Sequence, residues 1–186
     1  MFSKLKILVV GPCESGKTAI SNFLSDASEM TSGAYRPTKG VRILETEIDG
    51  VDVGANQSVT VEVALWDCSG DQSFEICWPS MQKGVNGVIF VYNPGVPRHL
   101  KELEVWHLHF AKELGIRDQQ CLVLAHQKPG ITGEGKILGG MSRIQLMTSN
   151  IDEDPDALQE QFKDFLGNVL TFINDRNEQE ELSILE

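Results

Sequence analysis

The stretch LKILVVGPCESGKT, residues 5–18, decides the fold of this chain. Its first six residues form a short apolar run, which is typical of a buried β-strand. The segment that follows, residues 11–18, matches the pattern G-x-x-x-x-G-K-T, and helical spacing of apolar side chains begins at its end. A strand, a glycine loop and a helix in that order predict a phosphate-binding loop, because backbone N–H groups and the helix N-terminus both favour an anion.

We expect this whole loop to bind the phosphates of a nucleotide. Lys17 should reach the β- and γ-phosphates, and the Thr18 hydroxyl should bind Mg²⁺. The alternative is an ordinary glycine-rich turn with a buried threonine, which the flanking strand and helix disfavour. The predicted phosphate-binding residues are Gly11, Pro12, Cys13, Glu14, Ser15, Gly16, Lys17 and Thr18.

The bulk composition indicates one domain that does not bind nucleic acid. The chain has 186 residues and 41% hydrophobic content, enough for one core and too little for two comfortable domains. A formal net charge of -11 disfavours non-specific binding to nucleic acid or an anionic membrane. The four cysteines lack metal-like spacing and should be free thiols in a reducing compartment. We expect no signal peptide, membrane span or prenyl anchor.

Strand and helix patterns alternate along the rest of the chain. The pair at 41–48 and 60–66 alternates apolar and polar residues and predicts an antiparallel pair with a long hairpin loop. Such alternation predicts a mostly parallel sheet covered on both faces, in one domain over 1–175 with an acidic, mobile tail at 176–186. The predicted strands are 5–10, 41–48, 60–66, 87–92, 120–125 and 144–147, and the predicted helices are 17–25, 97–114 and 156–175.

Two further motifs offer groups for a metal and a γ-phosphate. Asp67 ends an apolar strand, where its carboxylate can reach the outer shell of a metal, and Gly70 can bring its N–H near the γ-phosphate. Thr38 lies in a proline-containing loop and can close onto Mg²⁺. Each motif alone could be a plain turn or a surface loop, but their order after the phosphate-binding loop favours function. We predict Thr18, Thr38 and Asp67 as the metal site.

Together, the loop at 11–18, Pro-Thr-Lys-Gly at 37–40 and Trp-Asp-Cys-Ser-Gly at 66–70 resemble the first three guanine-nucleotide motifs of Ras/Rab small GTPases. The resemblance covers about residues 4–175. It implies an α/β, Ras-like P-loop GTPase fold, with a six-stranded, mostly parallel sheet, one antiparallel strand and helices on both faces. It also implies GTP or GDP and Mg²⁺ as ligands.

Longer matches narrow the resemblance. The segments at 11–18, 37–45 and 74–79, with the acidic end at 179–184, look like the Rab-like small GTPases of the intraflagellar transport B complex. That family implies docking on coiled-coil core subunits, as a monomer within a larger complex. It implies a place in the cytoplasm and the cilium or flagellum, without direct membrane insertion.

The base-recognition motif of the superfamily, Asn-Lys-x-Asp, is degenerate here. In one register His126 replaces the Asn; in the other Gln127 does, and Lys128 keeps the Lys role. Neither register supplies the Asp that reads the two N–H donors of guanine, so guanine selectivity should be weakened. The stretch 148–150 resembles the motif that backs the base with main-chain N–H groups. The predicted nucleotide-binding residues beyond the first loop are Asp67, Gly70, His126, Gln127, Lys128, Ser149 and Asn150.

Slow hydrolysis is expected from two substitutions. Asp71 stands where the superfamily carries the Gln that orients the attacking water, so it is at most a weak catalytic residue, and Cys13 can crowd the transition state. The expected intrinsic rate is on the order of 10⁻⁴ s⁻¹ or below. A nucleotide-gated scaffold subunit is the first hypothesis and a cycling GTPase assisted by an activating protein is the second. A nucleotide kinase is disfavoured, because the glycine-rich segment at 128–140 does not look like an arginine-rich lid.

Overall fold

The computed structural model describes residues 4–27, 36–130 and 133–184. In these residues, six strands form one sheet in the order β2-β3-β1-β4-β5-β6. Strands β2 and β3 are antiparallel, and the other neighbours are parallel, which confirms the predicted Ras-like sheet. The strands are β1 (Leu5–Val10), β2 (Val41–Asp52), β3 (Ser58–Cys68), β4 (Gly87–Tyr92), β5 (Cys121–His126) and β6 (Gln145–Ser149).

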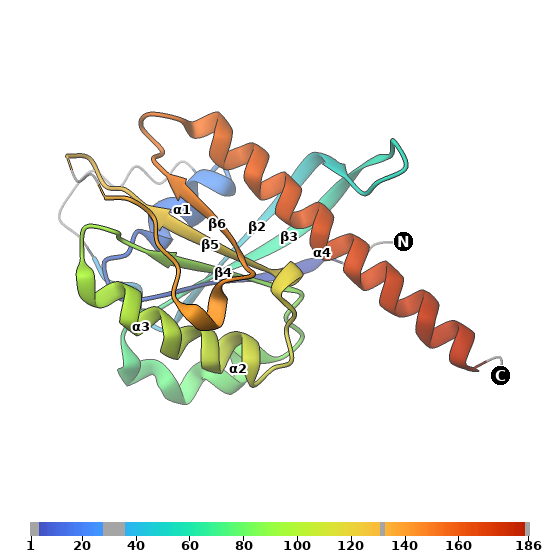
Figure 1. Cartoon of the computed structure of the whole chain (residues 1–186), viewed down its shortest axis with the longest axis horizontal. Helices are drawn as coiled ribbons and strands as arrows, with labels where there is room; N and C mark the ends of the chain where they lie inside the picture. Colours follow the sequence, from blue (N-terminus) through green and yellow to red (C-terminus); the bar gives the residue numbers. More distant parts are fainter. Residues whose placement is uncertain (1–3, 28–35, 131–132, 185–186) are drawn as a thin grey trace.

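Helices cover both faces of the sheet (Figure 1). Successive strand residues point to opposite faces, so Ile7 and Val9 pack beneath α1 and α4, whereas Leu8 and Val10 pack beneath α2 and α3. The two resulting cores position the carboxyl ends of the central strands at one edge. The helices are α1 (Lys17–Leu24), α2 (Trp78–Gln82), α3 (Pro97–His107) and α4 (Pro155–Ile184), with the short helical segments η1 (Gln72–Cys77), η2 (Leu108–Lys112), η3 (Asp118–Gln120) and η4 (Gly139–Met141).

An aromatic cluster holds α2 against α3. Trp78 is only 6% exposed, and its ring centroid lies 5.3 Å from that of Trp106 and 5.0 Å from that of Phe110. Full burial of each such side chain contributes on the order of 2 kcal/mol. These contacts fix α2, and with it the segment that follows Asp67, relative to the sheet.

Several boundaries differ from the sequence prediction. The hairpin loop between β2 and β3 is short, because both strands extend further than their alternation indicated and only residues 53–57 connect them. The helix predicted over 97–114 is α3 followed by one π-helical turn, η2. Segments η1 and α2 were not predicted, since they are too short to show a helical period. Residues 28–35 of the predicted loop lie outside the described residues.

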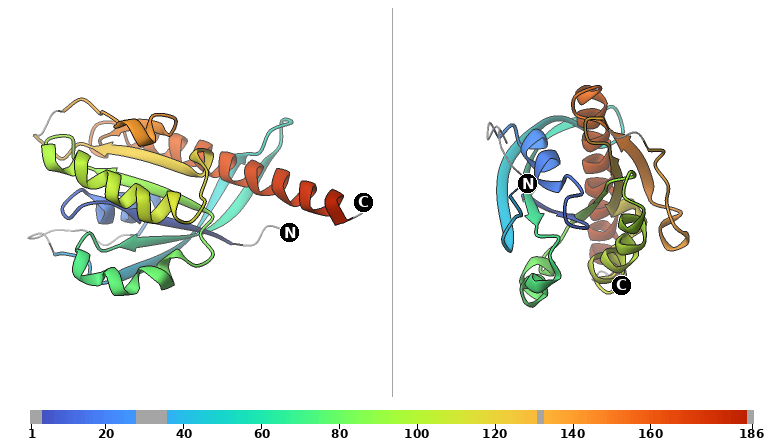
Figure 2. Two further views of the ribbon diagram at one scale, coloured as in Figure 1. Left: turned by 60° about the horizontal axis from the view of Figure 1, so that its bottom comes forward. Right: turned by 90° about the vertical axis from the view of Figure 1, so that its left-hand side faces the viewer.

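Helix α4 continues through the predicted domain boundary at 175 (Figure 2). Its last part is rich in Glu and Gln, which favour helix, and Arg176 pairs with Glu180 one turn later. The segment expected as a mobile tail is therefore helical up to Ile184, and a separate tail remains a prediction. The four cysteines are free thiols. No helix in the described part of the chain is both long and apolar enough to cross a membrane.

Candidate nucleotide and metal site

The loop between β1 and α1 has a backbone that only glycine allows at two points. Gly11 has φ of 147°, and a Cβ there would lie 2.1 Å from the Val91 carbonyl oxygen. Gly16 has φ of 101° and precedes the first residue of α1, so the N-terminus of the helix opens directly toward the loop. Such a loop followed by a helix N-terminus is a built anion site.

Lys17 is buried within this loop. Its Nζ donates to the carbonyl oxygens of Gly11, at 2.9 Å, and Pro12, at 2.7 Å. An ammonium has three donors, so capacity remains for an anion. Burial lowers the pKa of Lys17 to about 8, against the opposing charge of Asp67. Ser15 Oγ is also buried and has no hydrogen-bond partner in the described residues. Both groups fit a phosphate ligand.

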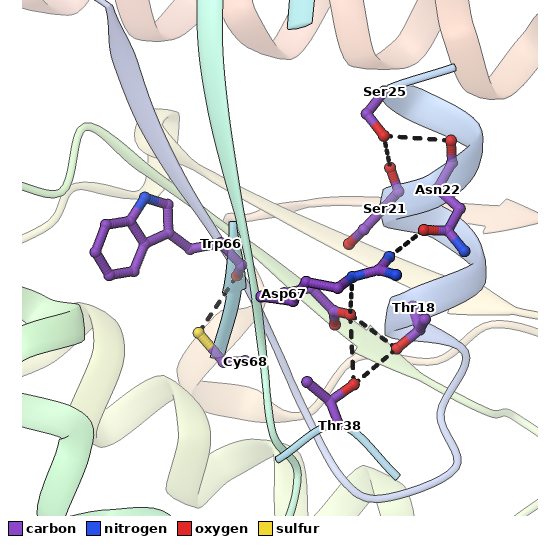
Figure 3. Close-up of polar contacts among 9 residues, drawn as sticks. Thr18, Ser21, Asn22, Ser25, Thr38, Trp66, Asp67 and Cys68 are labelled. Atoms are coloured by element: carbon purple, nitrogen blue, oxygen red, sulfur yellow. Dashed lines mark hydrogen bonds and ion pairs between the residues drawn. The ribbon is translucent and has the colours of Figure 1, made fainter. Parts of the chain in front are cut away.

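The three predicted metal ligands lie together (Figure 3). Thr18 Oγ1 donates to Asp67 Oδ2 at 2.8 Å and lies 3.0 Å from Thr38 Oγ1. Thr38 Oγ1 lies 3.4 Å from the same carboxylate oxygen. The other oxygen, Asp67 Oδ1, is buried without a hydrogen-bond partner among the described residues. Two hydroxyls and a carboxylate with an unused oxygen are the hard oxygen groups that suit Mg²⁺.

The segment after β3 lies directly against the phosphate loop. A Cβ on Gly70 would lie 2.5 Å from the backbone nitrogen of Cys13, so only glycine fits there. This close approach places Gly70 beside the loop and ties the segment after Asp67 to it, and the contact of the Gly70 N–H with a γ-phosphate stays a prediction.

Asp71 is engaged in local structure. It is the N-cap of η1, and its Oδ1 accepts from the Ser73 backbone N–H at 2.8 Å. These hydrogen bonds from Ser73 lower the pKa of Asp71, so the exposed carboxylate is an anion at neutral pH. Burial raises the pKa of the Cys13 thiol, which is therefore neutral. Asp71, with its lowered pKa, and Cys13, as a neutral thiol, are both weak bases for accepting a proton from the attacking water.

We call the predicted base-recognition residues, 126–128 and 149–150, the base end of the site. His126 connects this base end to the phosphate-binding loop. It is the last residue of β5 and is buried, and its Nδ1 lies 3.2 Å from Ser149 Oγ at the end of β6. A Cβ on Gly16 would lie 2.3 Å from His126 Cδ2, so the ring lies against the loop. Burial lowers the pKa of His126, which keeps the ring neutral.

The other predicted base-end residues serve different contacts. The Gln127 side chain donates to the Gly133 carbonyl oxygen, and its backbone N–H donates to the Ser149 carbonyl oxygen, both at 2.8 Å. Asn150 Oδ1 accepts from the Asp152 N–H and closes the turn after β6. Lys128 is half-buried, and its charge lowers the pKa of Lys17. The contacts of His126 favour the register in which His126, and not Gln127, takes the place of the Asn.

Two residues at the site were missed by the sequence analysis. Arg42 on β2 lies opposite Asp67 on β3, and its Nη2 donates to the Asn22 side-chain oxygen on α1. The signal was present in the alternation of β2, because the polar residue four positions after Thr38 faces the metal site. The pairing register of the two strands, which the sequence did not give, is what identifies it.

Comparisons with known proteins agree with this geometry. A family model, Ras of Complex, Roc, domain of DAPkinase, matches residues 6–128. The chain is 44% identical to an intraflagellar transport protein 22 homolog of Danio rerio over 185 residues, covering 98% of each chain. It is 34% identical to intraflagellar transport protein 22 of Chlamydomonas reinhardtii, covering 76% of this chain and 69% of that one.

Solved structures agree as well. A GTP-bound crystal structure of T. brucei IFT22 matches with a TM-score of 0.66 and 27% identity, covering 89% of this chain and 95% of that one. The GDP-bound form matches with a TM-score of 0.69 and 26% identity, covering 91% and 97%. With a Ras-like fold and relatives similar over almost the full length, this chain belongs to the intraflagellar transport protein 22 family of Rab-like GTPases.

Proposed function

We propose that this chain binds GTP or GDP with Mg²⁺ and serves as a Rab-like subunit of intraflagellar transport complex B, in cilium or flagellum assembly or transport. The T. brucei relatives were crystallised bound to GTP and to GDP. The observation that carries the proposal is the contact of Thr18 and Thr38 with one oxygen of Asp67, beside the buried ammonium of Lys17.

Each of these groups has a separate role in the proposed binding. Lys17 and the N–H groups of the loop bind the β- and γ-phosphates, and Mg²⁺, when bound, neutralises charge on the phosphate oxygens. Thr18 and Thr38 offer hydroxyl ligands, and Asp67 orients them by accepting from Thr18. Because Thr38 comes from the loop before β2, its hydroxyl couples the position of that loop to the occupancy of the site.

Hydrolysis by this site should be slow. A water-orienting residue must accept and donate near the γ-phosphate, whereas Asp71 is an anion that already accepts from Ser73. The negative charge of the Asp71 carboxylate would also repel the γ-phosphate. The proposed intrinsic rate is therefore at or below that of an unassisted small GTPase, on the order of 10⁻⁴ s⁻¹.

Docking on coiled-coil core subunits is the proposed means of reaching the cilium from the cytoplasm. One solved structure similar to this chain is a T. brucei IFT22/74/81 complex in the GTP-bound form, with a TM-score of 0.65 and 28% identity. We propose that the chain enters such a complex as one copy and that its nucleotide state orders the docking surface.

Fluorescent nucleotide binding tests the proposed site. Titration of the nucleotide-free chain with mant-GDP should show Mg²⁺-dependent binding, and Thr18→Ala should lose most of that dependence. Thr171→Ala is the matched control, since this threonine on α4 is exposed and its described hydrogen bond is to the Gly167 carbonyl oxygen. Mant-GDP binding that ignores Mg²⁺ in the wild type, or that Thr18→Ala leaves intact, would refute the proposed metal role.

Two measurements separate a scaffold from a cycling GTPase. A scaffold keeps phosphate release at background when ciliary extract is added, whereas a cycling GTPase is accelerated by an activating protein in the extract. Binding of a Thr18→Asn variant to reconstituted core subunits tests whether bound nucleotide controls docking. Undiminished binding by that variant would show that nucleotide does not control docking.

A further inference from the structure

Arg42 lies beside the proposed metal site but outside every motif that defines it. β2 and β3 pair so that Arg42 is directly opposite Asp67, and Arg42 Nε lies 3.8 Å from Asp67 Oδ2. Arg42 Nη2 donates to Asn22 Oδ1, one turn after Thr18 on α1. The guanidinium therefore connects α1 to the carboxylate of the site.

Asp67 is a buried carboxylate that needs a counter-charge. Its side chain is 0% exposed, whereas that of Arg42 is 30% exposed. Burial raises the pKa of Asp67, and the hydrogen bond from Thr18 and the charges of Lys17 and Arg42 oppose that rise. Of these two cations, Lys17 bonds the loop carbonyls and Arg42 makes the ion pair with the carboxylate. An isolated buried charge is strongly unfavourable, so this pair stabilises the metal-free chain.

We infer that Arg42 is a positioning residue that competes with the divalent cation for Asp67. It balances the carboxylate when no metal is bound, and it lowers the affinity of the site for Mg²⁺ by placing a second positive charge beside the same oxygen. The inference rests on the proposed nucleotide function. Its consequence is that Mg²⁺, and with it the nucleotide, leaves this chain more readily than it would with a neutral residue at this position.

The test is the Mg²⁺ dependence of mant-GDP release. Chain loaded with mant-GDP is chased with unlabelled GDP at free Mg²⁺ concentrations set by a chelator, and the Mg²⁺ midpoint of the release rate is recorded. Arg42→Gln should lower that midpoint roughly tenfold, because one nearby charge is removed. Arg42→Lys retains the charge and should stay within about twofold of the wild type.

A matched control removes the same charge elsewhere. Arg176→Gln on α4 loses an exposed arginine whose described ion pair is with Glu180, so its midpoint should equal that of the wild type. A midpoint that moves equally in Arg42→Gln and Arg176→Gln, or in neither, would overturn the inference. A shift in Arg42→Lys as large as that in Arg42→Gln would also overturn it, because geometry and not charge would then be responsible.

Thermal unfolding supplies a second readout that needs no nucleotide. Without metal, Arg42→Gln should have a lower Tm than wild type, and Mg²⁺ should raise its Tm by more. Equal Mg²⁺-induced shifts would contradict the inference. If Arg42→Gln does not fold, Asn22→Asp takes its place. This variant keeps an acceptor for Arg42, offsets its charge and should also lower the midpoint, so an unchanged midpoint would overturn the idea.

Nucleotide binding by the chain and the role of Arg42 are tested by different outcomes. A wild-type chain that binds no mant-GDP would refute the proposed function, and the Mg²⁺-induced Tm shifts would still decide the role of Arg42. A wild type that binds mant-GDP with Mg²⁺ dependence, while Arg42→Gln matches its midpoint and its Tm shift, would refute the inference alone.

Discussion

The phosphate end of the site retains the residues expected for phosphate binding, whereas the base end lacks the carboxylate expected for guanine recognition. At the phosphate end, Gly11, Gly16 and Gly70 each occupy a place where a Cβ would collide, and Thr18 meets Asp67. At the base end, His126 packs against the loop, and residues 126–130 contain no carboxylate. Under the proposed function, phosphate binding therefore depends on the backbone, whereas base recognition depends on side chains that can change without altering the fold.

Removal of the buried ammonium should have the largest effect. Lys17→Met should weaken GDP binding by at least about a hundredfold, because it deletes a charge-assisted contact to the phosphates. Isothermal titration of the nucleotide-free chain measures it. Lys101→Met, an exposed lysine on α3, is the control of equal charge. A loss of less than about fivefold would show that the loop does not bind phosphate as described.

A carboxylate restored at the base end should have the next largest effect. If His126 replaces the Asn of the Asn-Lys-x-Asp motif, Pro129 stands where the motif has its Asp. Pro129→Asp should therefore raise GDP affinity about tenfold and leave ADP affinity unchanged. Gly130→Asp is the same test of the other register and should have little effect. If Gly130→Asp is the variant that gains guanine selectivity, Gln127 and not His126 takes the place of the Asn.

The lowered pKa of Lys17 predicts a pH dependence at the phosphate end only. In the nucleotide-free chain this pKa is about 8, and bound phosphate should raise it, so binding takes up a proton above that pH. GDP affinity should be flat from pH 6.5 to 7.5 and about tenfold weaker at pH 9. Calorimetry in two buffers of different ionisation enthalpy counts the proton. A GDP affinity that stays constant up to pH 9 would contradict the lowered pKa of Lys17.

Asp71 should have the smallest effect, on hydrolysis and on local stability. Asp71→Gln should raise single-turnover GTP hydrolysis several-fold, because it removes an anion and restores a neutral donor and acceptor. The same change removes the N-cap of η1, so the free energy of unfolding should fall. Asp71→Asn separates the two, since Asn also caps. A faster rate in neither variant would place the cause of slow hydrolysis elsewhere.

The sequence predicted the phosphate end in more detail than the base end. The spacing around Lys17, Thr38 and Asp67 matched motifs whose residues have one geometric solution, and the predicted neighbours are in contact. The sequence could not decide whether His126 or Gln127 replaces the Asn, because that choice depends on which of the two side chains contacts Gly16 and Ser149.

Other features were hidden for physical reasons. Arg42 became visible only through the pairing of two strands distant in the sequence, since no local pattern reports a cross-strand contact. The helical segments η1 and α2 are shorter than two helical turns, so their periodicity is not readable. Helix α4 extends past the apolar stripe from which its end was predicted, because helix-favouring polar residues continue it.

The most direct test of the central claim is the identity of the nucleotide that co-purifies with the wild-type chain. The chain is purified in buffer with Mg²⁺, denatured, and its released nucleotide is resolved by anion-exchange chromatography. We predict close to one guanine nucleotide per chain, reduced to a small fraction in Lys17→Met. An adenine nucleotide at that stoichiometry, or no nucleotide under conditions where the chain is folded, would contradict it.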